Sequence, residues 1–214
     1  MALTGLFLCL FLVGHLAGNL QLILKTGAEG QQVFNEYAQF MTTFPLVKIL
    51  SYLTYASVLF HVVDGIVLTL QNRKARPVAY VKENGAANAK WSSRNMGVLG
   101  TIILVFLVSH MQNFWYQMHF GDIPMHNGIK DLHSVVLKFF SPENPWSLMA
   151  VGGYVLAQGA LAFHLSHGFQ SGFQSLGIRH AKYTPWIEKS GMAFALIVPA
   201  LFAIIPIFLY ITQQ

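Results

Sequence analysis

Hydrophobic residues are concentrated in five long runs, and polar residues collect in the segments between them. The runs cover roughly 2–24, 46–70, 96–118, 146–169 and 190–212. Each is close to the length of about 20 apolar residues that a helix needs to cross a bilayer. Because lipid cannot hydrogen-bond exposed backbone groups, each run should be α-helical. The pattern predicts an all-α membrane protein with a single domain, a bundle of five transmembrane helices.

Composition narrows the possible chemistry. Of the 214 residues, 54% are hydrophobic and 10% are charged. The single cysteine, Cys9, excludes an intramolecular disulfide, a CxxC zinc site and the CxxCH attachment of c-type haem. The first run lacks the basic region and the small-residue cleavage site of a signal peptide, so we expect it to be a span.

Basic residues in the connecting segments predict the orientation. Cytoplasmic loops carry an excess of Lys and Arg. The loops at 71–95 and 170–189 carry nine such residues, which are Arg73, Lys74, Arg76, Lys82, Lys90, Arg94, Arg179, Lys182 and Lys189. The opposite ends carry four, which are Lys25, Lys48, Lys130 and Lys138. We therefore expect a cytoplasmic N-terminus and an outer C-terminus.

Each of the first four runs has one histidine well inside it, and the depths of these four residues match in pairs. With 1.5 Å of rise per residue, His15 and His110 lie about 12–14 Å inside the outer boundary. By the same measure, His61 and His164 lie about 8–14 Å from the cytoplasmic boundary. The surrounding sequences also echo one another, as in LFLVGH and VFLVSH. These similarities predict two related helical hairpins followed by one further helix.

Two pairs of imidazoles at two depths are the ligand set that two bis-histidine haems require, each iron bound from opposite faces by different helices. Any one of these histidines, taken alone, is more often a hydrogen-bonded packing residue than a ligand. Small residues stand beside them: Gly14 and Gly18 near His15, Gly65 after His61 and Gly168 after His164. These glycines fit either room for a porphyrin edge or close helix packing.

Further polar residues in and near the runs have open roles. His167, one turn beyond His164, is the rival ligand on the fourth helix. Asp64, the only acid inside a span, either orients an imidazole or reaches the headgroups. The long outer segment 119–145 contains several Gly and Pro breakers, and we expect a short interfacial helix within it.

Four motifs together resemble a known family, the single-subunit, five-helix, di-haem cytochrome b anchor of succinate dehydrogenase and fumarate reductase. The motifs are ALTGLFLCLFLVGHLAGNL around His15, LFHVVDGI around His61, LVSHMQNFW around His110 and FHLSHGFQS around His164. The resemblance implies a distal haem b held by His15 and His110 near the outer face. It also implies a proximal haem b held by His61 and His164 near the cytoplasm.

The resemblance implies a function in electron transfer. The chain is then the quinone-reactive membrane subunit of a respiratory complex II in a bacterial cytoplasmic membrane, linked to the tricarboxylic acid cycle. A flavoprotein subunit with FAD and an iron–sulfur subunit with its clusters would bind its cytoplasmic face, and the anchor alone would have no catalytic activity. Membrane quinone, expected to be menaquinone, would be the substrate.

The family also suggests residues for proton chemistry. An outer acid between the first two helices exchanges the protons of quinone reduction, and Glu36 in FNEYAQF is the candidate, with Glu29 as its rival. Some menaquinol-oxidising members carry a glutamate two residues before the proximal ligand of the fourth helix. Ala162 occupies that position here, so that proton route does not carry over.

Other functions remain as alternatives from the sequence. Another quinone-linked dehydrogenase, such as a hydrogenase or a formate dehydrogenase, also uses a cytochrome b subunit. A histidine-rich divalent-metal transporter would use the same imidazoles along an ion path. Such a path should also carry acids within the membrane, where only Asp64 is present.

Overall fold

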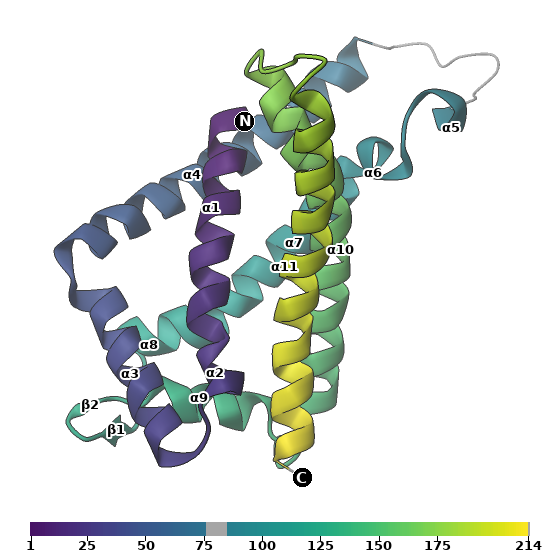
Figure 1. The fold of residues 1–214 in the computed structure, drawn as a ribbon. Coiled ribbons are helices and arrows are strands. Elements are labelled where there is room, and N and C mark those ends of the chain that lie inside the picture. The colour runs from purple at the N-terminus through teal and green to yellow at the C-terminus, as the bar shows by residue number, and fades with distance from the viewer. Residues whose placement is uncertain (76–84, 214) are drawn as a thin grey trace.

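Figure 1 shows the computed structural model, which describes residues 1–75 and 85–213. Arg76 and Lys82 of the basic loop lie outside the described residues. The elements are α1 (Ala2–Asn19), α2 (Gln21–Leu24), α3 (Gly27–Thr43), α4 (Pro45–Lys74), α5 (Gly85–Asn88), α6 (Trp91–Arg94), α7 (Met96–His110), a π-helix η1 (Met111–Trp115), α8 (Tyr116–Phe120), β1 (Met125–His126), β2 (Ile129–Lys130), α9 (Leu132–Phe140), α10 (Ser147–Ser175) and α11 (Thr184–Thr212).

Five helical stretches of the described chain are long and apolar enough to cross a membrane, which confirms the predicted number. They are Ala2–Leu24, Pro45–Lys74, Met96–Phe120, Ser147–Ser175 and Thr184–Thr212. Several continue beyond the apolar runs because their polar ends also favour a helix. Pro45 starts α4 with its φ angle already set for a helix, and Arg73 and Lys74 complement the dipole of the last turn.

The helices form an elongated bundle with two different ends (Figure 1). Helices α10 and α11 run side by side along their length, and α1 packs against α4, α10 and α11. The chain reverses between α10 and α11 at Gly177, whose φ of 77° favours glycine. We call the end with Met1 and the 176–183 turn the Met1 end. The opposite end, with α3, the β1–β2 hairpin and α9, is the α3 end.

The α3 end is built from the segments that connect the long helices. Helix α9 is the short helix expected in the 119–145 segment, and Asp131 caps it by accepting from the backbone N–H of Ser134. Helix α3 was not expected, and it places Glu29 and Glu36 on a helix instead of a loop. The turn of the hairpin uses Asn127 and Gly128, both with positive φ.

The main apolar core also lies towards the α3 end. Its buried members come from α1, α2, α3, α9, α10 and α11 and are Leu16, Leu22, Phe34, Val136, Phe140, Val151, Val198, Ile205 and Leu209. Many other large apolar side chains of the long helices are exposed, as a lipid-facing surface requires. The described structure therefore supports a multi-pass membrane protein.

Candidate functional site: two histidine pairs

The first pair of histidines meets between α1 and α7. The ring centres of His15 and His110 are 5.7 Å apart, with an angle of 86° between the ring planes. His15 lies near the α3 end of its helix, and His110 is the last residue of α7 before the π-helix η1. These are the two residues that the depth comparison along the sequence places together.

The second pair meets between α4 and α10, nearer the Met1 end. The ring centres of His61 and His164 are 6.2 Å apart, with an angle of 66° between the planes. Thr4 and Gly5, at the start of α1, both contact His61. This pair also consists of the residues that the sequence pairs by depth, and on α10 it is His164, not His167, whose ring meets His61.

Both separations suit one metal ion between two imidazoles. A metal–imidazole bond is about 2 Å long, so two rings on opposite sides of one metal have centres about 6 Å apart. Within the described residues, no group of three or more His, Cys, Asp or Glu side chains is placed to hold a metal ion. Each pair in this part of the chain therefore offers a metal ion two imidazoles.

Three of the four histidines have a polar neighbour at Nδ1. The Thr4 hydroxyl lies 3.3 Å from Nδ1 of His61, the Asn19 amide nitrogen 3.4 Å from that of His15, and the Tyr154 hydroxyl 3.4 Å from that of His110. The Nδ1 of His164 is buried and has no hydrogen-bond partner. A metal-bound histidine uses its second nitrogen for such contacts, which fix the ring. Sequence reasoning found none of these as positioning contacts, because Thr4 and Tyr154 are far from their histidines in the chain.

The first pair lies among aromatic rings. Phe11 stacks on His15 at 5.3 Å, and Phe106 stacks on His110 at 5.5 Å. Phe114 meets His110 edge-on at 5.4 Å. A spacing of four residues on a helix brings Phe11 to His15 and Phe106 to His110, so this part of the surroundings was readable from the sequence.

The glycines near the histidines differ in their surroundings. Gly14 is exposed, and a Cβ there would meet nothing within 4 Å, while a Cβ at Gly168 would approach His164 no closer than 4.0 Å. A Cβ at Gly18 would instead lie 2.6–2.8 Å from the ring and hydroxyl of Tyr37, and one at Gly65 would lie 3.1 Å from Met1. Gly18 therefore serves close packing of α3 on α1.

Asp64 does not orient an imidazole in this structure. Its carboxylate lies 2.6 Å from the amino group of Met1 and forms an ion pair at the Met1 end. His167 is half-buried on α10.

Glu36 is exposed on α3, and its carboxylate accepts a 2.6 Å hydrogen bond from the Gln32 side chain. Gln32 in turn accepts from Asn127 of the hairpin turn. One turn further along α3, Gln39 borders a hollow at the α3 end. The hollow is lined by Gln39, Thr42, Thr43, Met118, His119, Met125, Gly128, Ile129 and Lys130. The structure thus places Glu36 near this hollow rather than against either histidine pair. Glu29 lies in the first turn of the same helix.

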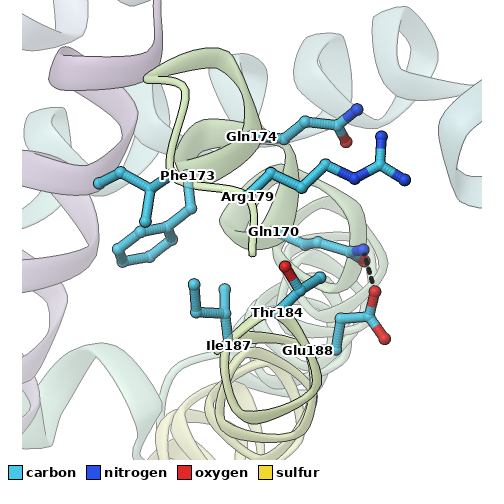
Figure 2. Close-up of a pocket in the computed structure, with 8 residues that line it drawn as sticks. Gln170, Phe173, Gln174, Arg179, Thr184, Ile187 and Glu188 are labelled. Carbon is cyan, nitrogen blue, oxygen red and sulfur yellow. Dashed lines mark hydrogen bonds between the residues drawn. The ribbon is translucent and has the colours of Figure 1, made fainter. Parts of the chain in front are cut away.

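A second hollow lies at the Met1 end, away from the histidines (Figure 2). It is formed where α10 turns into α11, and the Gln170 side chain there donates a 2.7 Å hydrogen bond to Glu188. The side chains of Gln174 and Arg179 lie at its rim, while Phe173 and Ile187 contribute the apolar wall. This region carries basic residues predicted to face the cytoplasm.

No protein-family model, curated protein or solved structure matches the chain.

Proposed function

We propose that this chain is the di-haem cytochrome b anchor of a succinate dehydrogenase or fumarate reductase. The observation that carries the proposal is the meeting of His15 with His110 and of His61 with His164, at separations of 5.7 Å and 6.2 Å and at two levels of one helical bundle. The anchor passes electrons between an iron–sulfur partner and a membrane quinone, and two haems b supply the one-electron carriers for that transfer.

The residues present fit these groups. Each pair comes from two different helices, as two ligands on one haem iron would require. The hydroxyl oxygens of Thr4 and Tyr154 can accept from the Nδ1–H groups of His61 and His110, which would leave the opposite nitrogen of each ring for iron. The Asn19 amide nitrogen beside His15 is a donor, and its 2.8 Å hydrogen bond goes to the His15 carbonyl oxygen. The unpartnered Nδ1 of His164 is a buried polar group that a haem-loaded state must satisfy.

The proposal assigns a side of the membrane to each end of the bundle. The Met1 end faces the cytoplasm, where a flavoprotein subunit and an iron–sulfur subunit bind, because Arg179 and Lys182 lie there. The His61–His164 pair is then proximal to those partners. The α3 end is the outer end, and the His15–His110 pair is distal. The membrane is a bacterial cytoplasmic membrane.

The quinone headgroup is assigned to the α3 end. The hollow beside Gln39 offers hydroxyl groups from Thr42 and Thr43 and a ring from His119, which are groups that bind quinone oxygens. Glu36, one turn away, exchanges protons with this region through solvent. Menaquinone is the proposed quinone.

Haem content tests the proposal directly. The purified chain should show a b-type difference spectrum with two haems per polypeptide, measured as pyridine haemochrome. His61→Ala and His164→Ala should each remove one haem and leave the other. The matched control is His180→Ala, which removes an exposed histidine at the Met1 end and should leave both haems in place. Two haems in either pair variant would refute the ligand assignment.

Partner identity separates the proposal from its closest alternative. Co-purification with a flavoprotein and an iron–sulfur protein that oxidise succinate supports the anchor of complex II. Co-purification with a hydrogenase or a formate dehydrogenase would instead identify the chain as the cytochrome b subunit of that enzyme. A colourless protein that binds Zn²⁺ through the same histidines would overturn both and favour a metal transporter.

A further inference from the structure

A buried carboxylate joins α3 to α9 at the α3 end. Asp131 is only 5% exposed, and the side chain of Asn35, which is 0% exposed, donates to it at 2.7 Å. Gln31 donates to the same carboxylate at 2.8 Å, and Ser134 donates through both its hydroxyl, at 2.6 Å, and its backbone N–H, at 3.1 Å. Asn35 also accepts from the backbone N–H of His133 at 2.9 Å. Every one of these donors is neutral.

A buried carboxylate with this many hydrogen bonds holds α3 and α9 together strongly and in one specific geometry. We call the contact between Asn35 and Asp131 the joint. Within the described part of the chain no cation is paired with Asp131, and the ammonium group of the neighbouring Lys130 is bound to the carbonyl oxygens of Met118 and Gly121. The helix dipole of α9 and four hydrogen bonds therefore stabilise the charge. Because an unmatched donor or acceptor in such a buried network is costly, α3 has one well-defined position on α9.

Each of the two joined helices packs against a residue that neighbours one member of the His15–His110 pair. On the α3 side, Tyr37 fills the space left by Gly18, which is one turn beyond His15 on α1. On the α9 side, Phe139 packs edge-on against Phe114 at 5.3 Å, and Phe114 packs on His110 at 5.4 Å. The joint between Asn35 and Asp131 connects these two sets of contacts, because it links α3 to α9.

We propose that Asn35 and Asp131 are positioning residues that seat α3 and α9 as a cap over the His15–His110 pair and keep outer water from that pair. The cap serves the proposed distal haem, so this inference rests on the proposed function. The described neighbours of the His61–His164 pair from other helices include Thr4 and Gly5 of α1 and Gly100 of α7, and none lies on α3 or α9. The second pair is therefore an internal control.

Three variants of the full-length protein, reconstituted in lipid nanodiscs, test the joint. Asn35→Asp would place two carboxylates face to face, and Asp131→Asn would replace the oxygen that accepts from Gln31 and Ser134 with an NH2 group that faces their donors. The exchanged double variant, with Asn35→Asp and Asp131→Asn together, restores a donor opposite an acceptor. Asp122→Asn is the matched control, since Asp122 is an exposed acid of the same segment with no side-chain hydrogen bond in the structure.

The first readout does not depend on haem. Diethyl pyrocarbonate modifies imidazoles that water can reach, and peptide mass spectrometry locates the modified residues. In the parent protein and in Asp122→Asn, His15 and His110 should stay unmodified while the exposed His180 reacts. Both single variants should make His15 or His110 reactive at least several-fold faster, and the exchanged variant should restore most of the protection. Unchanged reactivity in both single variants would overturn the inference.

The second readout uses the haem-loaded protein. Opening the cap should shift the midpoint potential of one haem, and the other should keep its parent value. Single variants whose two potentials both match Asp122→Asn would also overturn the inference. If the parent protein binds no haem, the proposed function fails, whereas the modification experiment still decides whether the cap exists.

Discussion

The hydroxyl group of Tyr154 on α10 lies 3.4 Å from Nδ1 of His110 on α7. If His110 binds iron through its other nitrogen, as proposed, its Nδ1–H would donate a hydrogen bond to the Tyr154 oxygen, which would make the ligand more basic and favour oxidised iron. Tyr154→Phe should keep both haems and raise the potential of one of them. A hydrogen bond of this kind is worth about 0.5–1.5 kcal/mol, which corresponds to a rise of about 20–60 mV. Redox titration followed by absorbance measures the shift.

Tyr52→Phe is the control for that titration, because Tyr52 is 69% exposed and lies away from the pair on α4. It should leave both potentials unchanged. A fall in potential for Tyr154→Phe, or equal shifts in both haems, would contradict the role given to Tyr154.

Close packing of α3 on α1 predicts that Gly18→Ala is destabilising. The added methyl group would lie 2.6–2.8 Å from atoms of Tyr37 and would force that ring out of its place. We expect a loss of about 1–3 kcal/mol in the free energy of unfolding, measured by thermal or denaturant unfolding in detergent. Gly159→Ala, where nothing lies within 4 Å, should be neutral or stabilise the helix by up to about 1 kcal/mol.

A double variant decides whether Tyr37 is the cause. Combined with Tyr37→Ala, Gly18→Ala should cost much less than it does alone, because the clash has been removed. Additive losses would show that the cost of the alanine at position 18 arises elsewhere.

The α3 end should lose stability in two stages as the pH falls. Burial lowers the pKa of His133 below its ordinary 6.5, and this effect outweighs the opposing charge of Asp131. Burial alone would raise the pKa of Asp131, but the hydrogen bonds from Ser134, Asn35 and Gln31 together lower it below 3.8. For both groups the unfolded segment binds more protons than the folded one at low pH, so stability falls with falling pH. The first loss begins as pH drops below about 6.5, and the second begins below about 4.

Hydrogen exchange of the α3 and α9 backbone amides across pH 3 to 8, corrected for intrinsic rates, measures these losses. His133→Gln should remove the upper stage and keep the lower one. His126 also affects the His133 pKa, so His126→Gln should move the upper stage without removing it. An α3 whose corrected protection is constant down to pH 3 would be incompatible with the buried carboxylate.

Proton exchange by Glu36 predicts a selective loss of quinone chemistry. In the complex purified with its partner subunits, Glu36→Gln should lower the rate of quinone reduction by about 100-fold and leave haem content unchanged. Glu143→Gln removes an exposed acid of the same end and should keep the parent rate. A loss confined to Glu29→Gln would transfer the role to the rival acid.

The histidine pairs were predictable because depth in an antiparallel bundle follows from counting residues along each helix. His15 and His110 needed only that count, and so did His61 and His164. Helix α3 was missed because its inward residues, such as Phe34 and Ala38, are separated by polar ones and form no long apolar run. Their spacing of four was the signal that could have revealed it.

The joint between Asn35 and Asp131 was beyond prediction for a different reason. The two residues are 96 positions apart, and each is an ordinary polar residue of a connecting segment until folding buries it. The same holds for Gly18, whose partner Tyr37 lies on a helix that the apolar pattern does not show. The pattern of hydrophobic residues predicts the long helices and the depths of their residues in the membrane. Contacts between connecting segments depend on the whole fold and are not visible in that pattern.

The π-helix that follows His110 absorbs one extra residue in the third span. A π-helix closes its hydrogen bonds over five residues instead of four, so Met111–Trp115 holds one residue more than an α-helical turn would need. Deleting one residue there would give a regular α-helix and leave the residues after it on nearly the same face, whereas deleting one residue from the regular helix α7 would rotate them by about 100°. The first change should therefore keep the 2.8 Å bond between the indole of Trp115 and Tyr55, and the second should break it. A natural variant of this chain one residue shorter within Met111–Trp115 could keep the same contact with α4.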